Sequence, residues 1–436
     1  NAPNPPGFAG HRALRVSSFP QAKPLVNMRY IMTTIEADIL IIGGGLVGGT
    51  LGCILADQGM SVVLVDREAP SDQMTPEYDG RASAIALGTQ RVLEGAGLWD
   101  DLKDDSAPID DIRVTDGDSL MFLHYDHNDM DIRPFGYMVE NRRLRVALAR
   151  RFGSLKKLNV LALDSIRNLD RDAGGVTATL ESGKTISAKL AIGADGRSSQ
   201  TREDAGIELT QWSYNQSGIV CTVEHEQSHE NIAHERFLPA GPFAILPLTG
   251  NRSCIVWTER SELAPAMMAL GDDEFNAELA RRFGDFLGKT RPTGPRWCYP
   301  LSLQFAERVL DKRLVLVGDA AHAMHPIAGQ GLNMGLRDVA AMAEVLSDAH
   351  RLGLDLGSAA VLERYERWRR FDNTLMLCMT DLLNRLFSND IAPIRLARDL
   401  GLAVVNRIPL LKRFFMRHAM GLVGDLPRLM RGEKLG

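Results

Sequence analysis

Three glycines near the start of the chain have the spacing needed to bind a phosphate group. Gly43, Gly45 and Gly48 stand in the arrangement G-x-G-x-x-G. The first allows a sharp turn, the second lets a pyrophosphate approach the backbone, and the third lets a helix pack close to a strand. Asp66 follows Gly48 by 18 residues, where an acid can bind ribose hydroxyls. The pattern indicates a dinucleotide site without saying which dinucleotide.

The residues around these glycines predict the strand–turn–helix–strand unit that a dinucleotide site requires. Ile39–Ile42 is an uninterrupted apolar run, as a strand buried on both faces requires. A helix is expected from about Leu46 to Gln58, with its free N–H groups at the phosphate. Gly59 ends that helix, and Val62–Val65 forms the second strand. A structural glycine turn in an unrelated α/β protein is the alternative, and the flanking elements argue against it.

Two further acidic turns follow buried strands later in the chain. Asp195-Gly196 ends the run LAIGADG, and Gly318-Asp319 follows a strand expected at Leu314–Val317. Because the carboxyl ends of parallel strands meet at one edge of a sheet, we expect both turns beside the glycine loop. An Asp-Gly pair is an ordinary turn in most proteins. At this edge, however, the Asp319 carboxylate would point at polyol hydroxyls of the ligand.

The segment after Asp319 supplies the argument for a flavin. Gly329 and Gly331 stand immediately before a helix expected from Asn333 onward. The backbone N–H groups of Gly331, Leu332 and Asn333 open that helix, so they can hold a negative charge on a ring carbonyl. A reduced flavin carries such a charge and a nicotinamide does not. We therefore expect FAD rather than NAD as the tightly bound cofactor.

Composition and charge argue against several other classes. The chain has 436 residues, 45% of them hydrophobic and 24% charged, which suits two or three globular domains. A net charge of −5 gives no basic field, so no nucleic-acid partner is expected. No apolar run is long enough to predict a transmembrane helix. The cysteines are scattered without a C-x-x-C pair, which indicates a reducing compartment and no metal or disulfide framework: Cys53, Cys221, Cys254, Cys298 and Cys378.

Residues 1–37 differ from the rest of the chain. They are rich in proline and basic residues and contain no acid before Glu36. They also lack the apolar core of a secretory signal. The composition fits an organelle transit peptide, and it fits equally well upstream sequence ahead of a start at Met28 or Met32. We expect a disordered or targeting extension here.

The remaining pattern divides the chain into domains. A helix is expected from about Ala84 to Gly97, and another over 141–152. Residues 206–305 contain short strands, with a hairpin signal at 249–251, which is typical of a mostly antiparallel sheet. The sequence predicts an α/β fold with a Rossmann-like FAD-binding domain (38–108, 130–205 and 306–345), an inserted antiparallel substrate domain (109–129 and 206–305) and a helical C-terminal region (346–436).

Two features of the C-terminal region call for interpretation. An apolar stripe at helical spacing is interpreted as core: Leu375, Met379, Leu382 and Leu386. From Ile391 onward the chain has nine basic and three acidic residues, with Leu410 and Phe414 among them. A basic amphipathic helix can lie on an anionic membrane surface. The alternative is a last helix that packs its apolar face on the protein and solvates its charges.

The motifs together resemble those of class A flavoprotein aromatic hydroxylases, with a para-hydroxybenzoate hydroxylase-like fold, over about residues 36–390. In this family Glu is commoner at the place of Asp66, and Gln is common at the place of Asn141. The Asp195-Gly196 turn is implied to touch both FAD and the incoming NADPH or NADH. The resemblance implies FAD contacts at Gly43, Gly45, Gly48, Asp66, Arg81, Asn141, Asp195, Gly196, Gly318, Asp319, Pro326, Gly329, Gly331, Leu332 and Asn333.

Narrower stretches resemble the ubiquinone-biosynthesis hydroxylases within that family: RASAIALG, WSYNQSGIV, ERFLPAGPFAILPL, HPIAGQGLN and RYERWRRFDN. This resemblance implies that NADPH or NADH reduces FAD, that O₂ then forms a C4a-hydroperoxyflavin, and that hydroxyl passes to the ring of a polyprenylated phenol. The flavin carries the chemistry, so no catalytic residue is assigned. His322 and His325 are candidates for a base, with structural roles around Pro326 as the alternative.

The resemblance leaves other questions of function and place open. One alternative is a flavin-dependent oxidase or reductase of an isoprenoid, and another is a non-catalytic scaffold of a quinone-synthesis complex. The expected partners are the prenylated phenol, a membrane surface and a quinone-synthesis protein complex. The expected place is the cytoplasmic face of a bacterial inner membrane, or the mitochondrial matrix side if residues 1–37 are a transit peptide.

Overall fold

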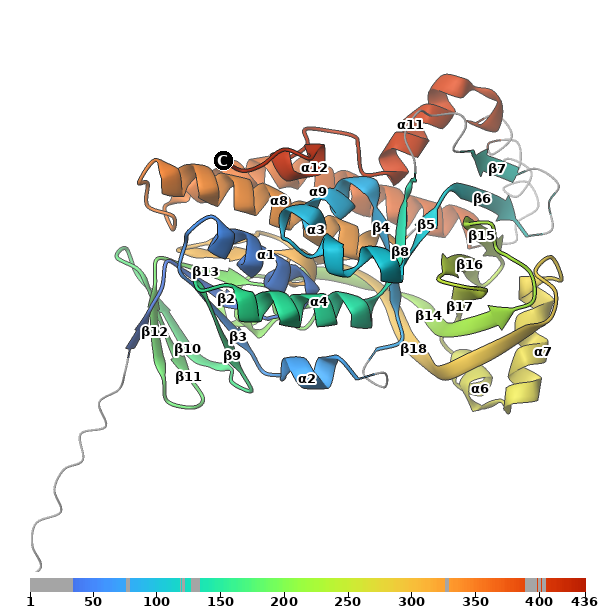
Figure 1. The fold of residues 1–436 in the computed structure, drawn as a ribbon, viewed down its shortest axis with the longest axis horizontal. Coiled ribbons are helices and arrows are strands. Elements are labelled where there is room, and N and C mark those ends of the chain that lie inside the picture. The colour runs from blue at the N-terminus through green and yellow to red at the C-terminus, as the bar shows by residue number, and fades with distance from the viewer. Residues whose placement is uncertain are drawn as a thin grey trace, which may run out of the picture.

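A central six-stranded sheet organises the protein, in a computed structural model that describes residues 34–75, 79–117, 119, 122–126, 134–325, 329–388, 398, 401 and 405–436. The strand order is β19-β20-β13-β2-β3-β9, and every strand is parallel to its neighbours except the edge strand β19 (Figure 1). The strands are β2 (Ile39–Ile42), β3 (Val62–Asp66), β9 (Leu158–Ala162), β13 (Leu190–Gly193), β19 (Leu310–Asp311) and β20 (Leu314–Leu316).

Strand β2 shows why its sequence has no polar position. Ile39 and Ile41 pack into a core shared with the helices, whereas Leu40 and Ile42 pack into a core under a second, smaller sheet. Successive side chains of a strand point to opposite faces, so a strand covered on both faces is apolar throughout. The helices that contribute to the first core include α1 (Leu46–Asp57), α3 (Leu87–Gly95), α4 (Asn141–Ser154) and α8 (Gln330–Arg351). The smaller sheet has the order β1-β12-β11-β10, with β1 (Thr34–Glu36), β10 (Ile166–Arg171), β11 (Val176–Leu180) and β12 (Thr185–Ala188).

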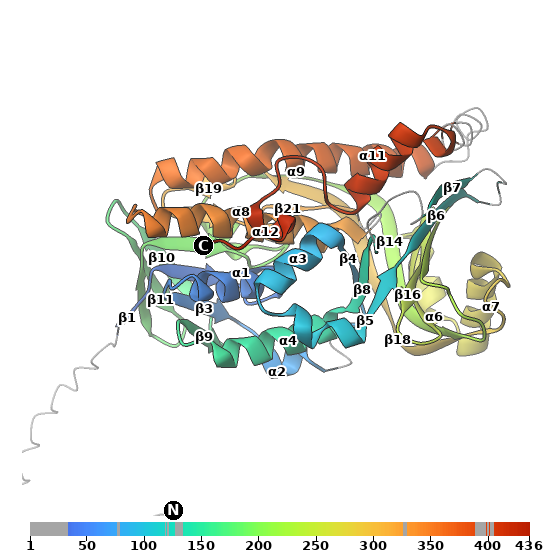
Figure 2. The same cartoon turned by 45° about the horizontal axis from the view of Figure 1, so that its top comes forward.

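A large, mostly antiparallel sheet stands beside the parallel one (Figure 2). Its order is β21-β18-β14-β17-β16-β15-β6-β7, and only β15 and β6 run parallel. The helices α6 (Ala264–Ala269) and α7 (Asp272–Phe283) cover its outer face, where Trp257 and Phe275 are buried. The strands are β6 (Asp111–Asp116), β7 (Phe122–Tyr125), β14 (Leu209–His225), β15 (Ile232–Leu238), β16 (Gly241–Leu248), β17 (Arg252–Arg260), β18 (Thr290–Ala306) and β21 (His322–Ala323).

Short elements connect the two large sheets. A three-stranded sheet has the order β4-β8-β5, with β4 (Ala82–Ala86), β5 (Ser106–Ile109) and β8 (Gly136–Glu140). The remaining short helices are α2 (Pro70–Gln73), η1 (Trp99–Asp101), η2 (Lys103–Asp105), α5 (Gln200–Asp204) and η4 (Gly318–Ala320).

The C-terminal region is helical, as the sequence predicts. Long helices α8 and α9 (Ala359–Phe387) pack against each other, and α11 (Pro409–Ala419) and α12 (Arg428–Arg431) follow. Within the part of the chain that the structure describes, no helix is long and apolar enough to cross a membrane. The interpretation of the apolar stripe on α9 is wrong, because Leu375, Leu382 and Leu386 are exposed. The buried face of α9 lies instead along Met376, Leu377, Thr380, Asn384 and Phe387.

Three expectations about local structure also need correction. The helix expected from Ala84 begins only at Leu87, because residues 82–86 pair with β8 as strand β4. Residues 34–36, expected within the N-terminal extension, form β1 and pair with β12. Gly331, expected before helix α8, lies inside its first turn.

Candidate active site

One cavity of about 1170 Å³ joins the parallel sheet to the antiparallel sheet. Gly45, Asp319 and residues 329–333 line it at one end. Strands β6, β15, β16 and β17 line it at the other, and residues of α9 and α11 close its side. Turns that are distant in sequence therefore share a single space, and that space continues into the predicted substrate domain.

The glycine loop has two crowded positions and one open position. A Cβ atom on Gly43 would lie 2.4 Å from the carbonyl oxygen of Ala194, and one on Gly48 would lie 2.0 Å from the carbonyl oxygen of Gly43. Gly43 also has a φ of +104°, which only glycine adopts readily. A Cβ on Gly45, in contrast, would meet no atom within 4 Å, and Gly45 lines the cavity. The crowded glycines build the turn, and the open one leaves room for a ligand.

Asp66 ends β3 directly beside the glycine loop. Its Oδ2 accepts a hydrogen bond from the N–H of Gly44 at 2.6 Å, and its Oδ1 accepts one from the N–H of Glu68 at 2.8 Å. It lines a small second pocket together with Gln73 and Phe152. The contact of Asp66 with a ribose stays a prediction.

The Asp195 side chain shapes its own turn. Its carboxylate accepts hydrogen bonds from the Ser199 hydroxyl at 2.5 Å and from the N–H and hydroxyl of Thr201 at 3.0 and 2.8 Å. Gly196, which has a φ of +82°, lines the cavity. The turn thus presents its glycine to the cavity and holds its acid at the start of α5. Direct contact of Asp195 with FAD or a nicotinamide cofactor stays a prediction.

The Gly318-Asp319 turn packs on the first turn of α1. A Cβ on Gly318 would lie 3.1 Å from Val47 Cγ1, and Gly318 has a φ of +59°. Asp319 is exposed and lines the cavity. The N–H of Gly318 donates to Oδ2 of Asp338 at 3.0 Å, which ties the turn to α8. All three turns therefore meet at the carboxyl edge of the parallel sheet, as the sequence predicts.

The start of α8 is fixed by Asn333. Its Nδ2 donates to the carbonyl oxygens of Ala84 and Gly329 at 2.8 and 3.1 Å, and its Oδ1 accepts from the N–H of Ala86 at 2.9 Å and the hydroxyl of Thr89 at 2.5 Å. The Asn333 side chain is thus fully used within the protein, which leaves the backbone for a ligand. Gly331 and Leu332 line the cavity, and a Cβ on Gly331 would meet no atom within 4 Å. Pro326 lies outside the described residues.

Arg81 and Asn141 gather around a buried acid, Asp79. Arg81 donates two hydrogen bonds to Asp79, at 2.8 and 3.0 Å, and Asn141 Nδ2 donates one at 3.2 Å. Burial alone would raise the pKa of Asp79, but the bonds from Arg81 and Arg145 hold it below its usual value. The Arg81 guanidinium lies 5.0 Å from the centre of the Tyr299 ring. Arg81 and Asn141 both line the cavity, so the acid positions them at its wall.

This geometry fits an elongated dinucleotide. Open space at Gly45 and Gly331 leaves room for such a ligand, and the positive end of α8 would face its ring. The model of the family described as "FAD binding domain" matches residues 36–377. The chain belongs to this FAD-binding family. FAD is therefore its cofactor, and the isoalloxazine ring of bound FAD would lie against the backbone of residues 331–333.

Comparison with individual relatives shows which members of this family the chain is similar to. The chain is 59% identical over 402 residues to "Ubiquinone hydroxylase UbiL" of Rhodospirillum rubrum, covering 92% of this chain and 94% of that protein. It is 35% identical to "3-demethoxyubiquinol 3-hydroxylase" of Escherichia coli, covering 90% and 100%. It is 31% identical to human "Ubiquinone biosynthesis monooxygenase COQ6, mitochondrial", covering 93% and 97%. The resemblance of this FAD-binding protein to the hydroxylases of ubiquinone biosynthesis is confirmed.

Solved structures confirm the fold class. The p-nitrophenol 4-monooxygenase PnpA of Pseudomonas putida matches with a TM-score of 0.75 at 21% identity, over 90% of this chain and 100% of that one. PqsL of Pseudomonas aeruginosa, described as a probable FAD-dependent monooxygenase, matches with a TM-score of 0.71 at 22% identity, over 84% and 100%. The arrangement of a parallel FAD-binding sheet beside an antiparallel sheet is thus common to these proteins.

The two candidate histidines differ in their surroundings. His322 Nε2 lies 2.6 Å from Asp338 Oδ2, so it belongs to a buried ion-pair network away from the cavity. His325 is fully buried and lines the cavity, and neither of its ring nitrogens has a hydrogen-bond partner within the described parts of the chain. Burial lowers the pKa of His325 to about 4, which makes it a neutral ring at physiological pH. Its edge contacts Tyr214, with ring centres 5.3 Å apart.

Sequence reasoning missed the residues that support the flavin turns. Asp338 binds the Gly318 turn, His322 and Arg369, and the last of these lies in the stretch RYERWRRFDN. Tyr214 and Trp212, from the stretch WSYNQSGIV, both donate to Asp381 on α9, at 3.0 and 3.2 Å. Residues of two stretches that carry the resemblance thus form contacts between separate elements of the fold. The sequence could not pair these stretches with their partners, because Asp338 and Asp381 lie more than 30 residues away along the chain.

Proposed function

We propose that this FAD-dependent enzyme hydroxylates the aromatic ring of a polyprenylated phenol in ubiquinone biosynthesis. The observation that carries the proposal is the continuous cavity, which joins the flavin turns to a largely apolar wall wide enough for a ring and an isoprenoid tail. The names and high coverage of the relatives support the pathway.

When bound, FAD takes hydride from NADPH or NADH and delivers one oxygen atom of O₂ to the ring. The residues of the chain bind the cofactor and exclude water. The backbone of residues 331–333 would hold the ring carbonyl of the flavin, and the open space at Gly45 would admit the pyrophosphate. The apolar walls, among them Val256, Phe237 and Leu246, keep water from the reacting atoms.

Isotopically labelled O₂ tests the reaction. The purified protein should be yellow and, with NADPH or NADH and a short-chain prenylphenol, should place one labelled oxygen atom in the product. Mass spectrometry of a deletion strain should show an under-hydroxylated prenylphenol. A product without label from O₂ would favour an oxidase or reductase, and a colourless protein that cannot take up FAD would contradict the proposal altogether.

We further propose that helix α11 rests on a membrane surface and admits the isoprenoid tail. One face of α11 carries the exposed Leu410 and Phe414, at 83% and 52% exposure, beside exposed arginines at 413 and 417. The opposite face lines the cavity through Phe415 and His418. A helix of this kind can bury its apolar side chains among lipids while its bases meet anionic headgroups.

The basic residues of the C-terminal region fall into two groups, which the sequence did not distinguish: those paired within the protein and those of α11. Arg398 is buried against Asp116 at 2.8 Å, and Arg428 binds Asp348 at 2.6 Å. These arginines tie helices to the body of the protein. The bases that a membrane would meet are therefore those of α11, which lies beside the end of α9 (Figures 1 and 2). The cytoplasmic face of a bacterial inner membrane, or the matrix side in a mitochondrion, and a place in a quinone-synthesis complex belong to the same proposal.

Replacing both Leu410 and Phe414 by glutamate should weaken binding to vesicles about tenfold or more. The change removes two exposed apolar groups that lipids would bury and adds two charges that an anionic surface repels. Co-sedimentation with vesicles of phosphatidylcholine and phosphatidylglycerol measures it. Leu352→Glu is the control, since Leu352 is 72% exposed but lies at the end of α8. Equal binding of the double variant and this control would refute the membrane surface.

A further inference from the structure

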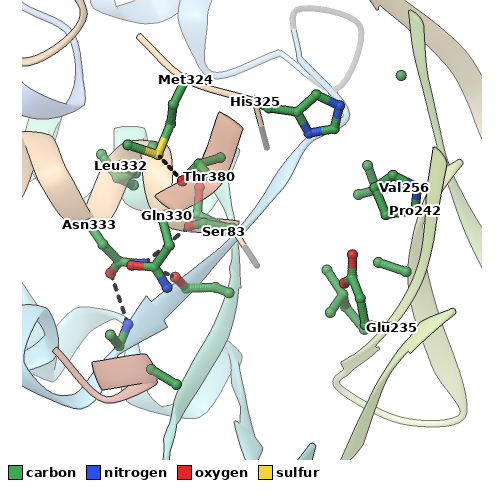
Figure 3. A pocket seen from close by; sticks show the side chains of 18 of the residues that line it. Ser83, Glu235, Pro242, Val256, Met324, His325, Gln330, Leu332, Asn333 and Thr380 are labelled. Atoms are coloured by element: carbon green, nitrogen blue, oxygen red, sulfur yellow. Dashed lines mark hydrogen bonds between the residues drawn. The ribbon is translucent and has the colours of Figure 1, made fainter. Parts of the chain in front are cut away.

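Glu235 is an acidic side chain on the apolar wall of the cavity. It lies on β15, across the open space from Gln330 and Asn333 of the flavin loop (Figure 3). Strand β15 is an interior strand, paired with β16 on one side and β6 on the other. Its side chain is only partly buried by area, and that free surface faces the cavity.

The wall around Glu235 offers almost nothing else to a polar ligand. The neighbouring strands place Val114 and Ala244 directly opposite it, and Ala233 and Phe237 stand on the same face of β15. The backbone groups of these interior strands are used in the sheet ladder. His234 also borders the cavity, but its ring packs on Phe286.

One other polar side chain stands on this wall. The Thr258 hydroxyl has no hydrogen-bond partner in the part of the chain that the structure describes, but Thr258 is only 2% exposed, so it reaches little of the cavity. Among the described residues of β6, β15, β16 and β17, Glu235 therefore provides the one charged group that lines the cavity. No hydrogen bond or ion pair links its carboxyl to another described residue.

A carboxyl in this position costs stability unless a ligand uses it. A polar group held in apolar surroundings without a partner is unfavourable, and pockets use a few such groups to orient their ligands. Burial raises the pKa of Glu235 to about 7. Near neutral pH its carboxyl can therefore accept a hydrogen bond from a hydroxyl when ionised, or donate one to an ether or carbonyl oxygen when protonated.

We propose that Glu235 holds an oxygen of the substrate ring by a hydrogen bond and thereby determines which ring carbon faces the flavin. The inference rests on the proposed function, since it takes the substrate to be a phenol with an apolar tail. The tail leaves toward α11 and the ring oxygen is held at Glu235. Two fixed points set the orientation of the ring in its plane, so a single carbon is presented for hydroxylation.

Two substitutions at Glu235 test this role. Glu235→Gln keeps a hydrogen-bonding side chain of the same size, whereas Glu235→Leu keeps the size and removes the hydrogen bond. The leucine variant should lose roughly tenfold or more of its hydroxylated product per NADPH or NADH oxidised, because the ring oxygen is left without a partner. It should also spread the product over more than one ring carbon. The glutamine variant should stay within about threefold of the native enzyme and keep one product.

A stability measurement separates this role from a structural one. Because the native carboxyl has no partner among the described residues, Glu235→Leu should retain FAD and melt at or above the native temperature. A leucine variant that melts lower or loses FAD would show that Glu235 supports the fold, which overturns the proposal. The exposed Glu262, replaced by leucine, is the surface control.

The outcomes distinguish this inference from the proposed function. If the native enzyme hydroxylates no prenylphenol, the proposed function fails. If the native enzyme hydroxylates one, and Glu235→Leu matches its coupling and its ring position, the role of Glu235 fails while the function stands. Titration of a short-chain prenylphenol against the flavin absorbance adds a binding constant, which should weaken in the leucine variant alone.

Discussion

Asp338→Asn should lower the free energy of unfolding by about 3–5 kcal/mol and release FAD, because it leaves the buried Arg369 guanidinium without its counter-charge. Asp338 is completely buried on α8 and accepts hydrogen bonds from Arg369 at 2.8 Å, from His322 at 2.6 Å and from the N–H of Gly318 at 3.0 Å. The same substitution therefore frees the turn that presents Asp319. Urea unfolding and the flavin content of the purified variant measure the two effects.

The stabilisation by the Asp338 carboxylate should depend on pH in a definite direction. Burial alone would raise the pKa of Asp338, but His322 and Arg369 hold it well below its usual value. The stabilisation is then present above the ordinary aspartate pKa of about 4 and is lost as the pH falls through the lower folded-state pKa. The asparagine variant should lack this acid-side loss.

A second acid on the same helix provides the control for Asp338. Asp348 is partly exposed and pairs with Arg428 at 2.6 Å. Asp348→Asn should cost less than Asp338→Asn, because the Asp348 carboxylate is partly exposed and water screens its ion pairs more strongly. If the two variants lose equal stability, or if Asp338→Asn keeps its flavin, the network does not hold the Gly318 turn.

Gly48→Ala should prevent the glycine loop from forming, and Gly45→Ala should leave the fold intact but weaken FAD binding about tenfold or more. In an exposed helix alanine is favoured over glycine by about 1 kcal/mol. At Gly48 the added Cβ would lie 2.0 Å from the Gly43 carbonyl oxygen and 2.9 Å from Ala194 Cβ, so the helix must move from the sheet. This displacement should cost about 3 kcal/mol or more.

The Gly45→Ala variant separates an effect on FAD binding from an effect on folding. Gly45 has a φ of −64°, which alanine adopts freely, and its Cβ would enter open space on the cavity wall. Thermal melting without added FAD should therefore match the native protein, while fluorescence titration with FAD should show the weaker binding. If Gly48→Ala melts like Gly45→Ala, the crowding at Gly48 does not control the fold; if Gly45→Ala binds FAD normally, the pyrophosphate does not pass Gly45.

The sequence predicted the parallel sheet and its three turns well, for a local reason. A strand that is covered on both faces must be apolar throughout, and a turn that closely approaches its neighbour needs glycine at the point of approach. Both constraints act on consecutive residues, so the sequence shows them directly. The Gly43–Gly48 loop, the Asp195-Gly196 turn and the Gly318-Asp319 turn accordingly lie where the pattern places them.

The misjudged helix α9 shows the limit of this reasoning. Its stripe of Leu375, Leu382 and Leu386 has the spacing of a core face, yet these side chains are exposed. Helical spacing shows which residues share a face, but it does not show whether another element covers that face. The buried face instead includes Thr380 and Asn384, which bond to residues from distant elements.

What the sequence determined by itself is therefore the dinucleotide loop, the parallel sheet and the family, because each is recorded in short runs of residues. The tertiary structure alone decided which acid supports the turns of the FAD-binding sheet and which one lines the cavity wall. Asp338 and Glu235 look alike in sequence as acids within regular elements. Asp338 is enclosed on α8 and bonded to Arg369, whereas Glu235 has no partner among the described residues and lies on an apolar cavity wall. Only packing creates that difference.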